Sequence, residues 1–239
     1  MHEPEKSPLE SLAERLPELL GKLEKSLGED ATASDHAKAF DLGCSLLNDL
    51  IKALEQPDSP LRSMDNAKGY GVSIFGDGLE RFLNQEKKLL EQFKLQPKQI
   101  ERALAILTAA HRDGETRDLQ VEASQVIEAL SQLREVVCAV KVHAKDGNKI
   151  PADLIGACYD STFDVAIIAG DAAVIPFSLA HGNPGGVILG ISSIGVGVRN
   201  LVKHVKKAKE LLQRFRTNLR INILHEKAPP KLNLKPKPK

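Results

Sequence analysis

The sequence of 239 residues is long enough for one large or two small domains with a buried core. Apolar residues make up 42% and charged residues 27%, as in ordinary globular proteins, whereas aromatic residues make up only 4% and tryptophan is absent. The scarcity of aromatic residues argues against surfaces that stack on bases or sugars, and against the aromatic belts of constitutive membrane proteins.

The net charge of +1 conceals two oppositely charged regions. Residues 199–239 contain 13 Lys or Arg and two acids, a net charge of +11, whereas residues 1–198 carry a net charge of −10. This asymmetry predicts a basic arm for an anionic surface, either nucleic acid or phospholipid, or an arm that holds the acidic part of the same chain. The acidic and polar first residues do not resemble a secretory signal, so the expected compartment is the cytoplasm.

Residues 7–28 predict the first helix, since Ser7, Pro8 and Glu10 form a capping box and leucines follow at helical spacing. Pro17 is expected to kink or split this helix. Ser34 is expected to cap a second helix that ends near Gln56.

Four glycines weaken any helix over residues 61–78. Asp77 can cap the helix that follows, and another helix is expected from Pro97 to Arg112. The most regular apolar pattern comes next and follows a heptad spacing, which predicts a long helix packed along another helix. Its members are Leu119, Ala123, Val126, Leu130, Leu133, Val137 and Val140.

The last third of the chain predicts a hydrophobic helical hairpin. A helix is expected over residues 151–180, with a kink at Pro176, and a second helix over residues 187–219. Between Asp164 and Val198 the only acids or bases are Asp164 and Asp171, with a histidine in the turn. Each arm of about 17 residues reaches roughly 25 Å, which is marginal for spanning a bilayer. The expected turn residues are Gly182, Asn183, Pro184, Gly185 and Gly186.

The apolar side chains of both arms are candidates for membrane insertion, and the basic residues after them are candidates for lipid headgroup binding. The insertion candidates are Val165, Ile167, Ile168, Val174, Ile175, Phe177, Leu179, Val187, Ile188, Leu189, Ile191, Ile194, Val196 and Val198. The headgroup candidates are Arg199, Lys203, Lys206, Lys207, Lys209 and Arg214.

Charged residues also form one stripe on each arm at helical spacing. One interpretation is a charged zipper inside the hairpin or a polar stripe lining a conduit. The favoured interpretation is that both stripes face solvent, because an apolar stripe lies opposite the basic one. Antiparallel pairing would place Asp164 opposite Lys203, Asp160 opposite Lys207, and Asp153 opposite Arg214.

No enzyme motif is present. The glycines at 69–78 lack the strand and the lysine of a phosphate-binding loop, and the seven histidines lack metal-ligand spacing. Neither a cofactor nor a metal is expected, and Ser193 has no histidine or acid near it in sequence. Cys44, Cys138 and Cys158 are expected to be isolated, buried thiols.

The sequence therefore predicts an all-α, elongated bundle of six to eight helices. Residues 1–145 would form a regulatory, shielding or oligomerising bundle, residues 150–222 the hairpin and basic helix, and residues 223–239 a disordered tail. In architecture, though in no motif, the arrangement resembles the pore-forming domains of colicins and other α-helical pore-forming toxins.

The expected function is that of a membrane-active protein, such as a toxin or defence effector. Its expected partners are anionic lipids on the cytosolic face of a membrane and either further copies of the chain or a helical protein, with nucleic acid disfavoured. The alternative is a soluble helical scaffold or interaction module with the hairpin as its core.

Overall fold

The computed structural model of the chain describes residues 8–57, 59, 77–112, 122–180 and 184–226. Among those residues every regular element is a helix and no strand occurs, which confirms the predicted all-α class. The elements are α1 (Pro8–Ala13), α2 (Leu16–Ser26), α3 (Ala33–Glu55), α5 (Asp77–Gln92), α6 (Pro97–Arg112), α7 (Ala123–Lys145), α8 (Ala152–Ala180) and α9 (Pro184–Glu226).

The helix boundaries follow local capping chemistry. Pro17 lies in the first turn of α2, where its missing N–H is not needed, so the predicted split between α1 and α2 is confirmed. The cap of α3 is Thr32 and not Ser34, so the prediction was two residues late. Thr32 Oγ1 accepts a hydrogen bond from Asp35 N (3.2 Å), and Asp35 Oδ2 accepts one from Thr32 N (3.1 Å).

Helix α7 packs along α3 and α9, as its apolar spacing predicts. Six of the seven predicted stripe residues are buried, and Leu119 lies outside the described residues. Asp41 of α3 pairs with Lys141 (2.5 Å) and Lys145 (3.5 Å) of α7.

A disulfide between Cys44 and Cys138 also joins α3 to α7, with the two Cα atoms 5.6 Å apart. The expectation that all three cysteines are isolated was therefore wrong for this pair. Their separation of 94 positions in the sequence hides the pairing, because only the packing of α3 on α7 brings the two side chains together.

The predicted hairpin consists of α8 and α9. Helix α8 continues through Pro176, and α9 begins at Pro184, three residues earlier than predicted. Pro184, Gly185 and Gly186 therefore belong to the first turn of α9 and not to the turn, because proline suits the first helical position. Gly182 and Asn183 lie outside the described residues.

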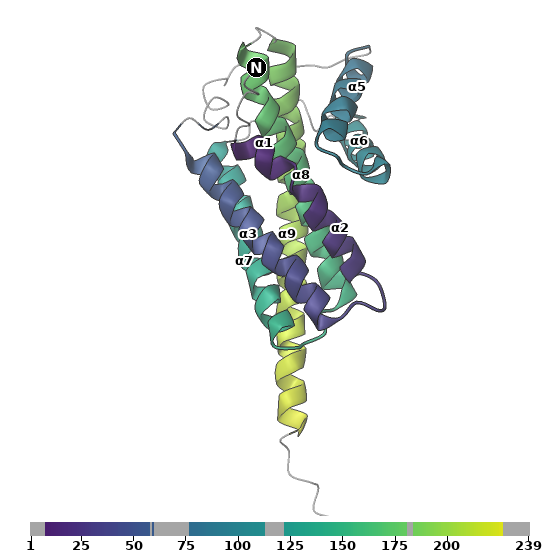
Figure 1. Cartoon of the computed structure of the whole chain (residues 1–239), viewed down its shortest axis with the longest axis vertical. Coiled ribbons are helices and arrows are strands. Elements are labelled where there is room, and N and C mark those ends of the chain that lie inside the picture. The colour runs from purple at the N-terminus through teal and green to yellow at the C-terminus, as the bar shows by residue number, and fades with distance from the viewer. Residues whose placement is uncertain (1–7, 58, 60–76, 113–121, 181–183, 227–239) are drawn as a thin grey trace, which may run out of the picture.

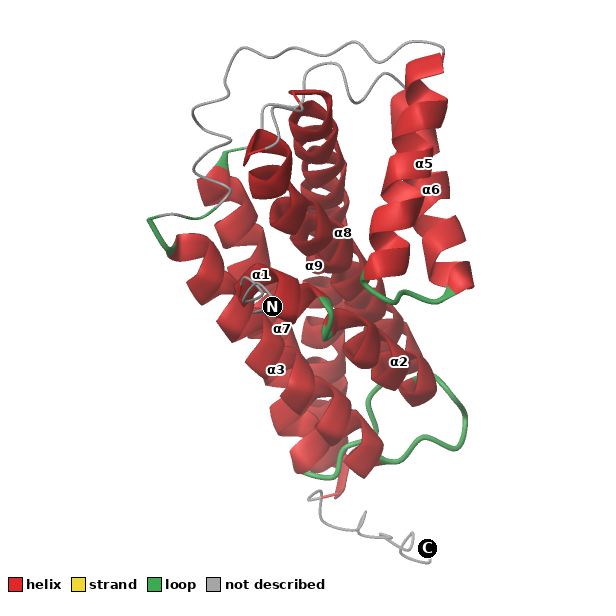
Figure 2. Ribbon diagram, turned by 45° about the horizontal axis from the view of Figure 1, so that its top comes forward, coloured by secondary structure: helices red, strands yellow, loops and turns green. Residues whose placement is uncertain are grey.

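In space, α8 and α9 run between two groups of helices (Figure 2). The pair α3–α7 lies on one side and the pair α5–α6 on the other, while α1 and α2 pack on α8. One apolar core includes residues from all these helices. None of the helices in the described part of the chain has both the length and the apolar character needed to cross a membrane.

Helix α9 is much longer than its partner, with 43 residues against 29 in α8. Its C-terminal part therefore projects beyond the other helices (Figure 1).

Candidate functional site

The candidate site is the α8–α9 hairpin together with the basic face of α9. Glycines allow its two arms to approach closely. A Cβ atom at Gly197 would lie 2.8 Å from Ile168 Cγ1 and 3.4 Å from the carbonyl oxygen of Asp164, and one at Gly190 would lie 3.2 Å from Ile175 Cγ1. A larger residue at Gly197 would force the arms apart.

The predicted insertion residues point into the protein wherever their side chains are described. Seven are buried, namely Val165, Ile167, Ile168, Ile175, Ile194, Val196 and Val198, and Ile191 is partly buried. The side chains of the other six, Val174, Phe177, Leu179, Val187, Ile188 and Leu189, lie outside the described residues. In this form the described part of the hairpin is covered by neighbouring helices.

Two aspartates of α8 are buried with the apolar residues, so the interpretation of the aspartate stripe as a solvent face was wrong for them. Asp164 is 0% and Asp171 is 2% exposed. Asp164 Oδ2 lies 2.7 Å from His204 Nδ1 of α9, so its partner is His204 and not Lys203. Asp160 pairs with Arg102 of α6 (2.5 Å) and not with Lys207, and Asp153 is exposed.

Asp164 and His204 both have raised pKa values, for different reasons. Burial raises the pKa of Asp164 to about 6, although the hydrogen bond from His204 opposes that rise. The same hydrogen bond to Asp164 raises the pKa of His204. One oxygen of Asp164, Oδ1, is buried without a hydrogen-bond partner.

Asp171 lies beside a second buried acid, Glu86 of α5, which is 5% exposed. Ser193 of α9, 0% exposed, donates a hydrogen bond to Glu86 Oε1 (3.0 Å). Burial raises the pKa values of both carboxyl groups, and the nearby Glu86 raises that of Asp171 further. Three helices therefore meet at a pair of acids in the apolar core.

Glu86 was not among the predicted site residues, although its spacing indicates a buried position. Glu86 lies three or four residues from Leu83, Leu89 and Leu90, which places it on the apolar face of α5. His204 likewise lies three residues after Leu201 and four before Ala208, both buried. An ionisable residue on an apolar face predicts a buried polar partner.

Arg102 of α6 connects the α5–α6 pair to helix α8 of the hairpin. Besides its ion pair with Asp160, its guanidinium lies 4.8 Å from the ring centroid of Phe163 and 5.6 Å from that of Tyr159. Phe93 between α5 and α6 reaches the position of Gly170, where a Cβ atom would lie 3.3 Å from its ring.

The basic side chains of α9 lie opposite its buried stripe. Lys203, Lys206, Lys207, Lys209 and Arg214 are exposed, and Arg199 is half-buried. Within the described ranges none of those five exposed residues makes an ion pair. In this part of the chain, the acidic residues therefore do not neutralise the basic face.

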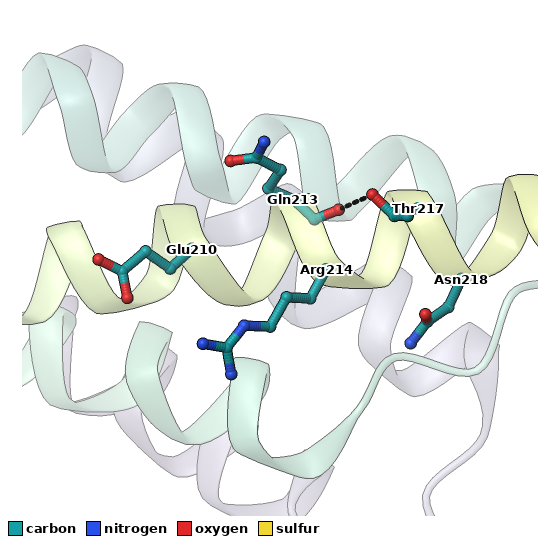
Figure 3. Close-up of a pocket in the computed structure, with 5 residues that line it drawn as sticks. All are labelled: Glu210, Gln213, Arg214, Thr217 and Asn218. Atoms are coloured by element: carbon teal, nitrogen blue, oxygen red, sulfur yellow. Dashed lines mark hydrogen bonds between the residues drawn. The ribbon is translucent and has the colours of Figure 1, made fainter.

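An open hollow lies along the C-terminal half of α9 (Figure 3). Glu210, Gln213, Arg214, Thr217 and Asn218 line it, and Thr217 Oγ1 donates to the carbonyl oxygen of Gln213 (3.0 Å). Because it is open and lies on one helix, the hollow does not enclose a ligand.

Neither metal chemistry nor nucleophilic catalysis has a structural basis among the described residues. They contain no cluster of three or more His, Cys, Asp or Glu able to hold a metal ion. Ser193 has an acid partner but is fully buried, and burial raises the pKa of the Cys158 thiol to about 12.

The chain matches no protein family model, no curated protein and no solved structure.

Proposed function

We propose that this chain is a membrane-active helical protein that binds anionic lipid through the exposed basic face of α9. The observation that carries this proposal is the row of four exposed lysines and one arginine that have no ion-pair partner among the described residues. A basic residue near an anionic membrane surface contributes about 1 kcal/mol of binding free energy. Several such residues on one exposed helix face form a binding surface that needs no enclosed pocket.

The second step of the proposal is conditional insertion of the hairpin. Its described apolar side chains are covered by the surrounding helices, and two buried aspartates make its transfer to lipid costly. Insertion therefore requires the covering helices to separate from α8 and α9. Several inserted copies would then assemble and make the membrane permeable, as a toxin or defence effector does.

The burial of Asp164 and Asp171 favours a competing function, a helical scaffold in which the hairpin is a permanent core. Each acid has a partner from another helix, His204 for Asp164 and Glu86 for Asp171. Such buried contacts stabilise one closed arrangement. A scaffold of this kind would bind neither neutral nor anionic lipid.

Vesicle binding and dye release distinguish these functions. The test variant replaces Lys203, Lys206 and Lys207 by Gln, and the matched control replaces three exposed lysines elsewhere, Lys25, Lys52 and Lys149. We expect wild type and control to bind vesicles that contain phosphatidylserine. The test variant should bind on the order of a hundredfold more weakly, since it loses about 3 kcal/mol.

Three results would contradict parts of the proposal. Equal weakening in both triple variants would show that net charge matters and the face of α9 does not. Binding without dye release would remove insertion and leave surface binding. If neither neutral nor anionic vesicles bind the wild-type chain, the scaffold function replaces the membrane function.

A further inference from the structure

We propose that α5 and α6 form a lid over the α8–α9 hairpin, and that one proton shared by Glu86 and Asp171 holds this lid closed. The lid and its proton do not depend on lipid binding. Only the use of the lid to uncover the hairpin for a membrane rests on the proposed function.

Helices α5 and α6 are placed to cover one side of the hairpin. They lie side by side on one flank of the protein, opposite α3 and α7 (Figure 2). Leu107 and Ala110 of α6 pack on Val196 of α9 in a small cluster, and Leu90, Ile100 and Ala103 of the same two helices belong to the main core. The lid is therefore attached to the hairpin by apolar contacts, to which its buried polar contacts add.

The two acids lack hydrogen-bond donors for two of their oxygens. Glu86 Oε1 accepts from Ser193, whereas Glu86 Oε2 and Asp171 Oδ2 are buried and have no donor. Two ionised carboxylates can only accept hydrogen bonds, and when buried their like charges also repel each other. One added proton lets one carboxyl donate to the other and removes one negative charge. In the proposed pair this proton lies between the two unpartnered oxygens.

No described cation faces the two acids to replace the proton. Apart from each other, their polar neighbour is Ser193. Other charged groups of the lid and the hairpin pair among themselves, Arg102 with Asp160 and Asp164 with His204. Burial raises the pKa values of Glu86 and Asp171, in agreement with a pair that keeps a proton when the lid is closed.

The proton fixes the direction of the pH effect. In an open lid both acids contact water and lose their protons at the ordinary pKa values of about 4. The closed lid retains one proton to higher pH, so the ratio of open to closed forms increases as pH rises. The increase is up to tenfold per pH unit, from about pH 5 until the closed pair itself ionises.

Amide hydrogen exchange of the full chain tests the lid directly. Peptides from residues 77–112 report on the lid, and peptides from α3 and α7 serve as an internal reference. After correction for the intrinsic exchange rate, we expect wild-type protection of the lid to fall by up to tenfold per pH unit above about pH 5. The reference peptides report the pH dependence of global stability, to which Asp164 and His204 also contribute, so the lid is compared with them in wild type and in each variant.

Replacing one acid by its amide removes the need for the proton. In Glu86→Gln the amide nitrogen can donate to Asp171 while the amide oxygen accepts from Ser193. In Asp171→Asn the new amide donates to Glu86, so one variant remains informative if the other misfolds. Both should hold the lid with a much weaker pH dependence. Glu91→Gln makes the same change at an exposed position of α5 and should behave as wild type.

Comparing wild type with the amide variants isolates the contribution of Glu86 and Asp171 from that of other titrating groups. The Asp164–His204 pair is retained in all these variants, so its contribution is common to all of them. If wild type and both amide variants lose protection with equal slopes, or if wild-type protection does not change with pH, the shared proton is refuted. These measurements contain no lipid, so a failure of the membrane proposal leaves them unaffected.

Discussion

Buried ionisable residues are the least expected feature of this chain, and the Asp164–His204 pair has a testable effect on stability. Both groups have raised pKa values, so the folded state retains protons that the unfolded state releases at lower pH. Their stabilisation is greatest below the unfolded pKa values. This stabilisation is lost as pH rises through the folded pKa values; the folded pKa of Asp164 is about 6.

We therefore expect the free energy of unfolding to decrease between about pH 4 and pH 8. Asp164→Asn should make this decrease shallower by up to about 3 kcal/mol in total, because a pKa unit corresponds to about 1.4 kcal/mol. Urea unfolding across this pH range measures the effect. Asp153→Asn, an exposed change on the same helix, should retain the wild-type slope; an identical slope in the two variants would contradict the prediction.

Two glycines with different surroundings give a second prediction. Gly197→Ala should lower the free energy of unfolding by about 1–3 kcal/mol, since the new Cβ would overlap Ile168. Gly21→Ala should raise it by about 0.5–1 kcal/mol, because Gly21 lies inside α2 with no atom within 4 Å of the added Cβ. Thermal or urea unfolding of both variants checks the opposite signs, and equal signs would contradict close packing of the hairpin arms.

At the scale of elements, the disulfide between α3 and α7 predicts a large effect of reductant. A cross-link that closes a loop of 94 residues stabilises by roughly 4–5 kcal/mol when its effect is taken as lost chain entropy. We expect reductant to lower the stability of wild type toward that of the Cys44→Ala/Cys138→Ala variant. The double variant should not respond to reductant.

Peptide mapping without reductant is the direct measurement. It should recover Cys44 linked to Cys138 and Cys158 as a free thiol. Free thiols at all three positions in oxidised protein would show that the bridge does not form.

Local sequence signals predicted most helices because capping and breaking residues act on their neighbours. Pro8 and Pro97 marked helix starts, and the apolar spacing of residues 123–140 marked the buried face of α7. The same signals did not locate Glu86 beside Asp171, nor Cys44 beside Cys138. Those contacts join helices far apart in sequence, and their register depends on packing that a one-dimensional pattern does not contain.

At the scale of the whole molecule, the uneven charge predicts a strong salt dependence of vesicle binding. Dissolved salt screens exposed charges, with a screening length of about 10 Å at 0.1 M. We expect the fraction of wild-type chain bound to phosphatidylserine vesicles to fall steeply as salt rises. The Lys203/Lys206/Lys207→Gln variant should show a shallower fall, and cosedimentation at several salt concentrations measures both. Equal salt dependence would place the lipid contact outside this face.

The length of α9 limits how the protein can rest on a bilayer. Forty-three helical residues form a rod of roughly 65 Å, so the tip beside residues 181–183 and the tip at Glu226 are far apart. A flat membrane can contact the whole length of α9 only if the helix axis is parallel to it. If the axis is perpendicular to the membrane, only one end of α9 contacts it. Under the proposed function, binding along the basic face and entry of the hairpin therefore need different orientations of α9, and the molecule would have to tilt between them.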